Sequence, residues 1–367
     1  MPSGSRYRVA IVGAGAIAGA HLKAVQALGD RAEVVAVADL DGDRATGFAT
    51  QHGVPQAFTD VPTLLEQARP DLVSVCTPPG AHRETVLAAL AAGAWVWCEK
   101  PPVLSLAEYD ELAGAEGEQG PYVGYVFQHR FGSAARTFRE QVAAGTLGRP
   151  HVAVCHTLWY RDHDYYAVPW RGKWETEGGG PAMGHGIHQM DLMLSLLGDW
   201  REITALMGTL DRDVQTEDVS VAAVSFESGA LATVVNSVLS PRQTSYLRFD
   251  LTDATVEVEH LYGYDNSNWT WTPREGVDAS GWAPATDEAS SHTAQLGAYL
   301  DAMDAGERPP ASGHDGRRSL ELVAALYQSA ITGQPVRRTD LKPGNPFYTA
   351  LDGGGRYTPH RPGEDAR

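Results

Sequence analysis

Residues 8–39 limit what this chain can fold into more than any other stretch does. A short apolar run rich in β-branched residues, Arg8–Val12, ends at a glycine turn. Apolar residues then recur at helical spacing from Ile17 to Leu28. A second apolar run follows at Glu33–Ala38 and ends at Asp39. This order of strand, glycine turn, helix, strand and acid is typical of a unit that binds a dinucleotide.

The residues of the turn each have a physical task in such a unit. Gly13 permits the tight turn, and Gly15 lets the backbone approach the pyrophosphate. Free N–H groups at the helix start face the phosphate charge, so Ala16 and Ile17 belong to the predicted cofactor site. Asp39 would accept hydrogen bonds from the ribose 2′-hydroxyl and repel a 2′-phosphate. We therefore expect NAD as the cofactor, with NADP less favoured.

Strands and helices continue to alternate as far as about residue 125, which predicts a doubly wound parallel sheet. The clearest later strands are Leu72–Cys76, Trp95–Cys98 and Tyr122–Phe127. Ligands bind beyond the carboxyl ends of such strands. Four residues near these ends are therefore predicted to bind the cofactor, although the histidine also fits a structural role. They are Thr77, Pro78, His82 and Glu99.

The pattern changes after about residue 125, which divides the chain into a nucleotide-binding domain, 1–125, and a second domain, 126–367. From Glu202 to His260 several short strands alternate apolar and polar positions. One face of an open sheet is therefore expected to cover a core. Helical patterns follow at about Glu288–Ala305 and Arg317–Thr332, so the second domain is also α/β.

Charge and cysteine content exclude several classes of function. The net charge is −17 and no run of basic residues occurs, so a nucleic-acid surface is not expected. Three cysteines, an odd number without metal-ligand spacing, indicate reduced thiols in the cytoplasm and predict no metal site. Neither a signal-peptide core nor a long apolar run occurs, so no membrane partner is expected.

Three motifs occur together in the chain, and with the glycine turn they resemble one known family. They are Thr77-Pro78-Pro79, Glu99-Lys100-Pro101 and GGGPAMGHGIHQMD at Gly178–Asp191. Over nearly its whole length the chain resembles the glucose–fructose oxidoreductase / inositol dehydrogenase (Gfo/Idh/MocA) family. The resemblance implies a Rossmann domain followed by an α/β domain with an open, mostly antiparallel sheet. It also implies nicotinamide-dependent oxidation or reduction of a small-molecule sugar, polyol or sugar derivative. In relatives that sheet forms the subunit contact, which implies a homodimer or homotetramer.

Lys100 is the first candidate for catalysis. Hydride transfer at a carbinol requires a proton to leave or reach oxygen, and a positioned ammonium stabilises the developing alkoxide. Desolvation in a cleft would lower the pKa of Lys100 towards the working range. Glu99 could orient the lysine. The alternative is an exposed lysine at a strand end.

His188 matches the catalytic histidine of the family. Asp191 follows one helical turn later and either orients the ring or faces elsewhere in a structural contact. The family often has an aspartate four residues before the histidine, whereas this chain has Gly184. His185 could take its place but points about 100° away in a helix. The proton relay is therefore expected from Lys100 and His188.

Aromatic and basic residues crowd the segment before the glycine run, from Arg161 to Trp174. Aromatic faces stack on sugar rings and arginine donors bind hydroxyl or carboxylate groups, so this segment is the candidate substrate wall. An ordered loop or an interface is the alternative. Gln128, His129 and Arg130 are weaker candidates for the same cleft. The residues predicted to bind substrate are Arg161, Tyr165, Trp170, Arg171 and His185.

Two other functions remain open beside the oxidoreductase. An NAD-dependent glycosidase would oxidise and re-reduce its substrate within one cycle and cleave the glycoside by elimination. A non-catalytic regulator would bind the nucleotide without turnover. The presence of both Lys100 and His188 argues against a pure binder, so the oxidoreductase is the favoured interpretation.

Overall fold

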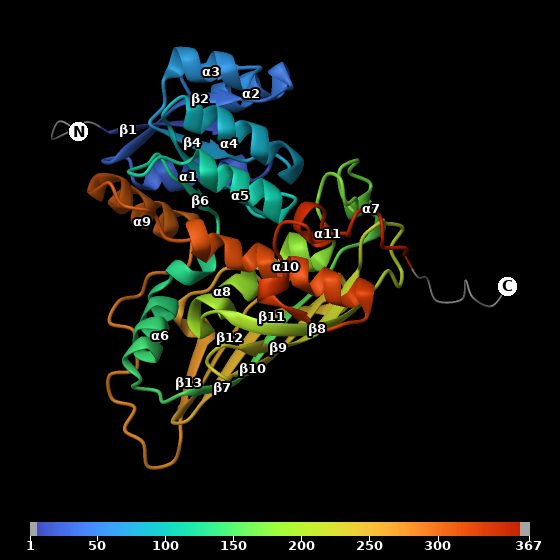
Figure 1. The fold of residues 1–367 in the computed structure, drawn as a ribbon. Helices are drawn as coiled ribbons and strands as arrows, with labels where there is room; N and C mark the ends of the chain where they lie inside the picture. Colours follow the sequence, from blue (N-terminus) through green and yellow to red (C-terminus); the bar gives the residue numbers. More distant parts are fainter. Residues whose placement is uncertain (1–5, 360–367) are drawn as a thin grey trace. The chain divides into compact units, whose positions relative to one another are not determined.

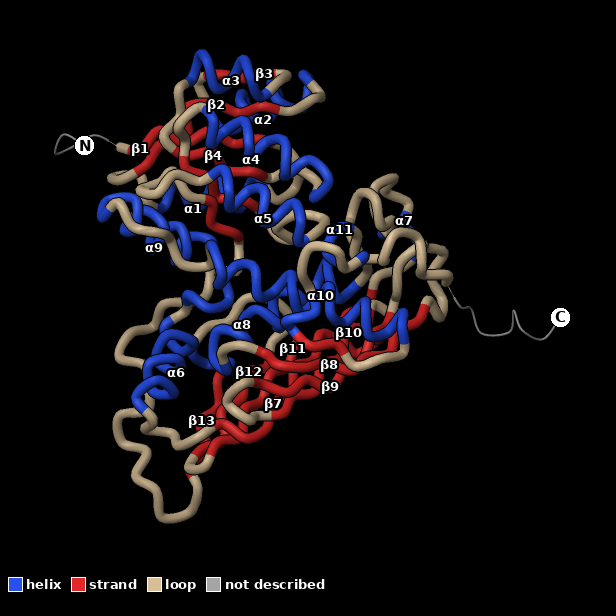
Figure 2. The backbone as a smooth tube through the Cα atoms, viewed as in Figure 1, coloured by secondary structure: helices blue, strands red, loops and turns tan. Residues whose placement is uncertain are grey.

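The computed structural model describes residues 6–359, which form two compact units (Figures 1 and 2). The first unit is built from the chain up to Val103, from Glu108–Val126 and from His292–Gly316. The second unit contains Leu104–Ala107, Phe127–Ser291 and the chain from Arg317 onward. We describe each unit on its own.

The described residues of the first unit form a six-stranded parallel sheet with the strand order β3-β2-β1-β4-β5-β6. The predicted doubly wound sheet is confirmed. The order reverses between β1 and β4, and ligands bind at such a point in open α/β sheets. The strands are β1 (Tyr7–Val12), β2 (Ala32–Ala38), β3 (Gln56–Phe58), β4 (Leu72–Val75), β5 (Trp95–Cys98) and β6 (Val123–Tyr125). The helices between them are α1 (Ala18–Ala27), α2 (Gly42–His52), α3 (Val61–Ala68), α4 (His82–Ala91) and α5 (Leu106–Ala115).

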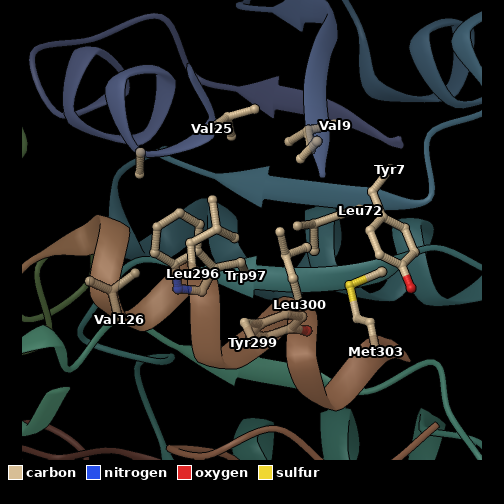
Figure 3. Close-up of a cluster of buried hydrophobic side chains, with 12 residues drawn as sticks. Tyr7, Val9, Val25, Leu72, Trp97, Val126, Leu296, Tyr299, Leu300 and Met303 are labelled. Carbon is tan, nitrogen blue, oxygen red and sulfur yellow. The ribbon is translucent and has the colours of Figure 1, made fainter. Parts of the chain in front are cut away.

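Helix α9 (His292–Ala305) also belongs to the first unit, although it lies far along the chain. Its apolar residues recur at helical spacing and pack with Trp97 and Leu72 of the sheet in one buried cluster (Figure 3). The hydroxyl of Tyr299 donates to the backbone carbonyl of Val96 at 2.7 Å. The predicted division of the chain into 1–125 and 126–367 assigns this helix to the second domain, whereas the structure places it in the first unit. Helical periodicity predicts the helix, but it does not say which sheet the apolar face will cover.

The described part of the second unit contains an eight-stranded sheet with the order β13-β12-β11-β7-β10-β9-β8-β14. The pair β7 and β10 is parallel and the other neighbours are antiparallel, which confirms the open, mostly antiparallel sheet. The strands are β7 (Pro150–Tyr160), β8 (Trp200–Gly208), β9 (Val219–Phe226), β10 (Leu231–Ser237), β11 (Leu239–Leu251), β12 (Ala254–Glu259), β13 (Trp269–Pro273) and β14 (Val336–Arg337). The remaining helices are α6 (Ser133–Ala144), α7 (His163–Tyr166), α8 (Ile187–Leu197), α10 (Gly313–Thr332) and α11 (Pro346–Thr349).

The two faces of this sheet differ in what covers them. Helix α8 packs against β7 and β11 on one face, where every second strand residue is buried. The opposite face exposes large apolar side chains in neighbouring strands. Leu206 lies beside Val221, and Val152 lies beside Leu231. Leu206 is 75% exposed and Leu231 is 59% exposed, so this face is an apolar surface.

Helix α10 is the longest of the described helices, with 20 residues. Charged side chains such as Asp315, Arg317 and Glu321 lie along it. Within residues 6–359, no helix combines the length and the apolar character needed to cross a membrane.

Candidate active site

The glycine turn of the first unit lies against the end of β4. Gly13 has a φ of +94°, and a Cβ at this position would lie 2.8 Å from the carbonyl group of Cys76. A Cβ at Gly15 would meet nothing within 4 Å, and Gly15 and Ala16 are exposed. The turn is therefore closed on the sheet side and open where a pyrophosphate would bind. Ile17, before α1, has no side-chain acceptor for the first N–H groups of the helix.

Asp39 is fixed beside this turn. Its Oδ2 accepts a hydrogen bond from the backbone N–H of Ala14 at 2.8 Å, and its Oδ1 accepts one from Asp41 at 2.9 Å. The guanidinium of Arg44 lies 3.2 Å from Oδ1, and the Arg44 side chain is 54% exposed. The carboxylate is thus held at the end of β2 next to the glycines, as NAD binding requires. These residues fit a dinucleotide.

His82 joins the chain segments that follow β4 and β5. Its Nε2 lies 2.9 Å from the carbonyl oxygen of Thr77, and its Nδ1 lies 3.0 Å from that of Pro101. The side chain is fully buried. The contacts hold two strand ends together, so His82 has the structural role considered above. Its contact with a cofactor stays a prediction, as do those of Thr77 and Pro78.

Glu99 is a buried carboxylate held between two histidines. Its Oε1 lies 2.9 Å from Nε2 of His21 and 3.4 Å from Nε2 of His292, and its Oε2 accepts a hydrogen bond from the backbone N–H of Lys100 at 3.1 Å. Burial opposes the charge of Glu99, but both imidazoles favour it and hold its pKa well below its usual value. Burial lowers the pKa of His21. This cluster fixes the segment that carries Lys100.

The same three side chains are the group in the described residues that has metal-ligand geometry. One ligand atom from each of His21, Glu99 and His292 lies within 4.8 Å of the others. The N···O distances are those of hydrogen bonds, and Ser74 Oγ lies 2.5 Å from the second nitrogen of His21. Hydrogen bonding therefore explains the close approach of His21 and Glu99. His292 was missed by sequence reasoning because a single histidine at a helix start carries no pattern.

In the second unit, His188 lies in the first turn of α8 and is 2% exposed. Its ring centroid is 5.0 Å from that of His129, 5.7 Å from that of Tyr262 and 6.4 Å from that of Phe127. Tyr264 lies 4.6 Å from the His129 ring. His129, a weaker candidate for the substrate cleft, thus lies next to His188. Tyr262 and Tyr264 belong to no sequence motif, so the sequence could not identify them as neighbours of these histidines.

Asp191 makes a buried ion pair with Arg130. Nε of Arg130 donates to Asp191 Oδ2 at 2.7 Å, and a second guanidinium nitrogen pairs with Oδ1. The hydroxyl of Ser319 donates to the same Oδ1 at 2.8 Å. Asp191 therefore makes the structural contact that was one of its two predicted alternatives.

The predicted substrate residues form one cluster within the second unit. The Arg171 guanidinium lies 3.8 Å from the Tyr165 ring centroid and 4.4 Å from that of Trp170. The Arg161 guanidinium lies 5.3 Å from the Tyr165 ring. The Tyr165 hydroxyl is 3.3 Å from Nε2 of His185. Stacked cations and rings in this arrangement suit a wall that binds hydroxylated rings.

Comparison with known proteins identifies the family. Residues 7–127 match the NAD-binding Rossmann domain of the GFO_IDH_MocA oxidoreductase family, and residues 135–259 match a C-terminal domain of the same family. The chain belongs to the Gfo/Idh/MocA oxidoreductase family. The sequence-based assignment to this family of enzymes is confirmed.

Similar proteins align over almost their whole length. D-glucoside 3-dehydrogenase of Escherichia coli is 29% identical over 357 residues, covering 90% of this chain and 97% of the relative. Myo-inositol 2-dehydrogenase of Thermotoga maritima is 28% identical over 352 residues, covering 91% and 99%. The structure of the WlbA dehydrogenase of Chromobacterium violaceum, with NADH and UDP-GlcNAcA, has 25% identity and a TM-score of 0.81. It covers 92% of this chain and 97% of that one.

The glycine-rich family motif before α8 is explained by close packing. The chain makes a π-helical turn at Ala182–Gly186 and then enters α8. A Cβ at Gly180 would lie 1.9 Å from the carbonyl oxygen of Glu217, and one at Gly186 would lie 1.8 Å from Oδ1 of Asn236 on β10. Glycine is therefore required where this segment crosses the sheet. π-helical turns of this kind occur frequently at functional sites.

The Glu217 carboxylate accepts hydrogen bonds from the backbone where the π-helical turn begins. Its Oε2 accepts a hydrogen bond from the backbone N–H of Gly180 at 2.9 Å, and its Oε1 accepts from Ala182 at 3.1 Å and from the Tyr327 hydroxyl at 2.9 Å. The side chain is fully buried. Burial raises the pKa of Glu217 to about 7, although the three donors oppose the rise. Sequence reasoning missed Glu217 because an acid in a loop carries no pattern.

This raised pKa predicts a pH-dependent stability. The folded protein holds the Glu217 proton up to about pH 7, whereas the unfolded chain releases it near its ordinary value of 4.5. The contribution of Glu217 to the free energy of unfolding therefore falls as the pH rises between these values, by on the order of 3 kcal/mol. We expect Glu217→Gln to remove this part of the slope in thermal unfolding measured from pH 5 to pH 8. Glu227→Gln, at an exposed position, should keep it. An unchanged slope in Glu217→Gln would contradict the assignment.

Proposed function

We propose that the protein is an NAD-dependent dehydrogenase or reductase acting on a CH–OH or ketone group of a sugar, a polyol or a sugar derivative. The observation that carries the proposal is the anchored end of β5, where the Glu99 cluster fixes the backbone of Lys100. The similar enzymes act on glucosides and inositol by name, and WlbA was crystallised with NADH and a nucleotide sugar. They support the substrate class.

Residues of the first unit would hold the cofactor. The glycine turn and the start of α1 would bind the pyrophosphate, and Asp39 would bind the adenosine ribose. The strand-end residues Thr77 and Pro78 would lie along the nicotinamide half. The nicotinamide supplies the hydride acceptor or donor when it is bound. The chain's own residues must then orient the substrate and move its proton.

Lys100 and His188 would carry that proton. In oxidation, a base takes the hydroxyl proton and an ammonium stabilises the charge that develops on oxygen. His188 is buried on a helix whose backbone position is fixed by Gly186 and Glu217, and its ring packs near those of His129 and Tyr262. Arg161, Tyr165, Trp170, Arg171 and His185 would bind the substrate hydroxyls and rings.

A substrate panel with a lysine variant tests the reaction. We expect NADH formation with at least one member of a panel that includes myo-inositol, D-glucose and methyl D-glucosides. Lys100→Ala should keep NADH binding but lower turnover by on the order of 10²–10⁴-fold, because its role is in the transition state. Lys23→Ala, at an exposed position, is the matched control. Turnover by Lys100→Ala at the wild-type rate would refute the role. Release of an aglycone without net NADH would favour the glycosidase.

Asp39 and Arg44 give the cofactor preference a separate test. We expect calorimetry to show tighter binding of NAD than of NADP, because the Asp39 carboxylate repels a 2′-phosphate. Asp39→Ala should release the exposed Arg44 guanidinium and shift the ratio of the two dissociation constants toward NADP. The expected shift is on the order of tenfold, or about 1.4 kcal/mol. Asp43→Ala, on the same helix, should leave the ratio unchanged. Equal binding of both cofactors by the wild type would overturn the preference.

We further propose a homo-oligomer, a dimer or tetramer, formed through the apolar face of the eight-stranded sheet. Leu206, Val221 and Leu231 are exposed there in neighbouring strands, and an apolar surface of this kind is typical of an interface. Light scattering at micromolar concentration should give the mass of a dimer or tetramer. Leu206→Arg should lower it, while Val168→Arg, outside the sheet, should not. A wild-type monomer at this concentration would count against the interface.

A further inference from the structure

Gly184 is the position where this chain lacks the carboxylate that its relatives often have. It lies in the π-helical turn, four residues before His188, and it is partly exposed between the buried residues Met183 and His185. Its φ is not in the left-handed region, so the backbone here would accept a side chain. Neither the packing nor the backbone geometry therefore requires glycine at this position, unlike at Gly186.

The carboxylate of Glu177, from the turn that precedes Gly184 in the chain, lies beside this position. A Cβ built on Gly184 would have Oε1 of Glu177 as its neighbour, at 3.5 Å, and no other atom within 4 Å apart from those of the adjacent residues and of the turn's own backbone. Glu177 is 6% exposed, and its Oε2 accepts a hydrogen bond from the backbone N–H of Gly172 at 2.6 Å. This hydrogen bond fixes the side chain so that Oε1 is directed at Gly184. An aspartate at 184 would place its carboxylate in the same small region.

We propose that Glu177 supplies, from the preceding turn, the carboxylate that Gly184 cannot. The inference rests on the proposed function, since it gives Glu177 a role in the proton relay of that site. Glu177 is a positioning residue: its negative charge lies beside Gly184, which precedes His185 directly and His188 by four residues. It favours the protonated form of a histidine there, which is the form that results when the histidine takes the substrate proton.

The groups around Glu177 include one cation, Arg171, which partly offsets the charge of the carboxylate. The Arg171 guanidinium lies 3.6 Å from Glu177 Oε1 and also packs on Tyr165, whose hydroxyl faces His185. The ring of Trp159 lies against His185, with Arg161 stacked on Trp159. The titratable rings of His129 and Tyr262 lie near the ring of His188. Among these named neighbours Glu177 is the acid. Burial raises the pKa of Tyr165, and the negative charge of Glu177 adds to this rise.

Histidine titration by NMR tests the proposal without any substrate. We expect Glu177→Gln to lower the titration midpoint of His185 or His188 by about half a unit or more, because an acidic neighbour is lost. Glu175→Gln removes an exposed acid from the same turn and should change neither midpoint. His185→Asn and His188→Asn assign the two signals.

Moving the carboxylate gives the decisive comparison. The double variant Glu177→Gln/Gly184→Asp should restore the midpoint, whereas Glu177→Gln/Gly184→Asn should not. Gly184→Asp alone would place a second carboxylate beside that of Glu177, so the pair should retain a proton and the midpoint should stay near the wild-type value. If Glu177→Gln fails to fold, the Glu177 carboxyl signal is followed instead: its own titration midpoint should rise in His185→Asn or His188→Asn, because a nearby imidazolium is lost. Equal effects of Asp and Asn at 184 in the Glu177→Gln background would overturn the proposal, since a merely structural Glu177 would not distinguish them. A Glu177 midpoint that neither histidine variant changes would also overturn it.

Kinetics connect this result to the reaction. With the best substrate of the panel, Glu177→Gln should lower kcat about tenfold or more with a smaller change in KM, and it should shift the pH profile. Gly184→Asp should recover kcat in that background. If Lys100→Ala loses turnover and Glu177→Gln keeps the wild-type kcat and pH profile, the Glu177 role is wrong and the proposed function stands. If Lys100→Ala is also unaffected, the proposed function itself fails.

Discussion

The first unit depends on one buried carboxylate. Glu99 is held by His21 from the glycine-turn helix and by His292 from a helix almost two hundred residues later in the chain. A buried charge without partners would destabilise the fold by several kcal/mol, so these contacts are required once Glu99 is ionised. In return, the carboxylate joins the cofactor turn, the β5 end and α9 at one point. The backbone of Lys100 is fixed by the same group.

Close backbone approach plays the corresponding part in the second unit. At Gly180 and Gly186 a single added carbon would overlap Glu217 or Asn236, so the turn before α8 lies directly on its neighbours. His188 follows this turn in the chain, so the packing of the turn also fixes the backbone of His188. The two proposed proton carriers are therefore fixed by different means, one by a charge network and the other by sterics. Both interactions fix the backbone, and the side chains of Lys100 and His188 would carry out the proton transfer.

Sequence patterns predicted most of the fold because its local signals are strong. The bounds of β5 agree with the predicted range Trp95–Cys98 to the residue, since a run of apolar residues marks this strand. Contacts across long separations could not be predicted. The docking of α9 and the capping by Glu217 depend on how distant segments pack, and the approach of Glu177 to Gly184 depends on the path of the turn between them. The resemblance to the family implies a carboxylate where this chain has Gly184, but only the structure shows that the carboxylate of Glu177 lies beside this position.

The return of α9 to the first unit has a consequence for the order of synthesis. A ribosome completes all six strands of the Rossmann sheet by Tyr125, but Leu296, Tyr299 and Leu300 emerge only after the eight-stranded sheet has largely been made. Until then only α1, through Ala24 and Val25, packs on the face formed by Val9, Leu72 and Trp97. The part that α9 will cover stays exposed, and exposed apolar surface of this kind promotes aggregation. The nucleotide-binding domain therefore stays unfinished on the nascent chain from the synthesis of β6 until α9 has been made.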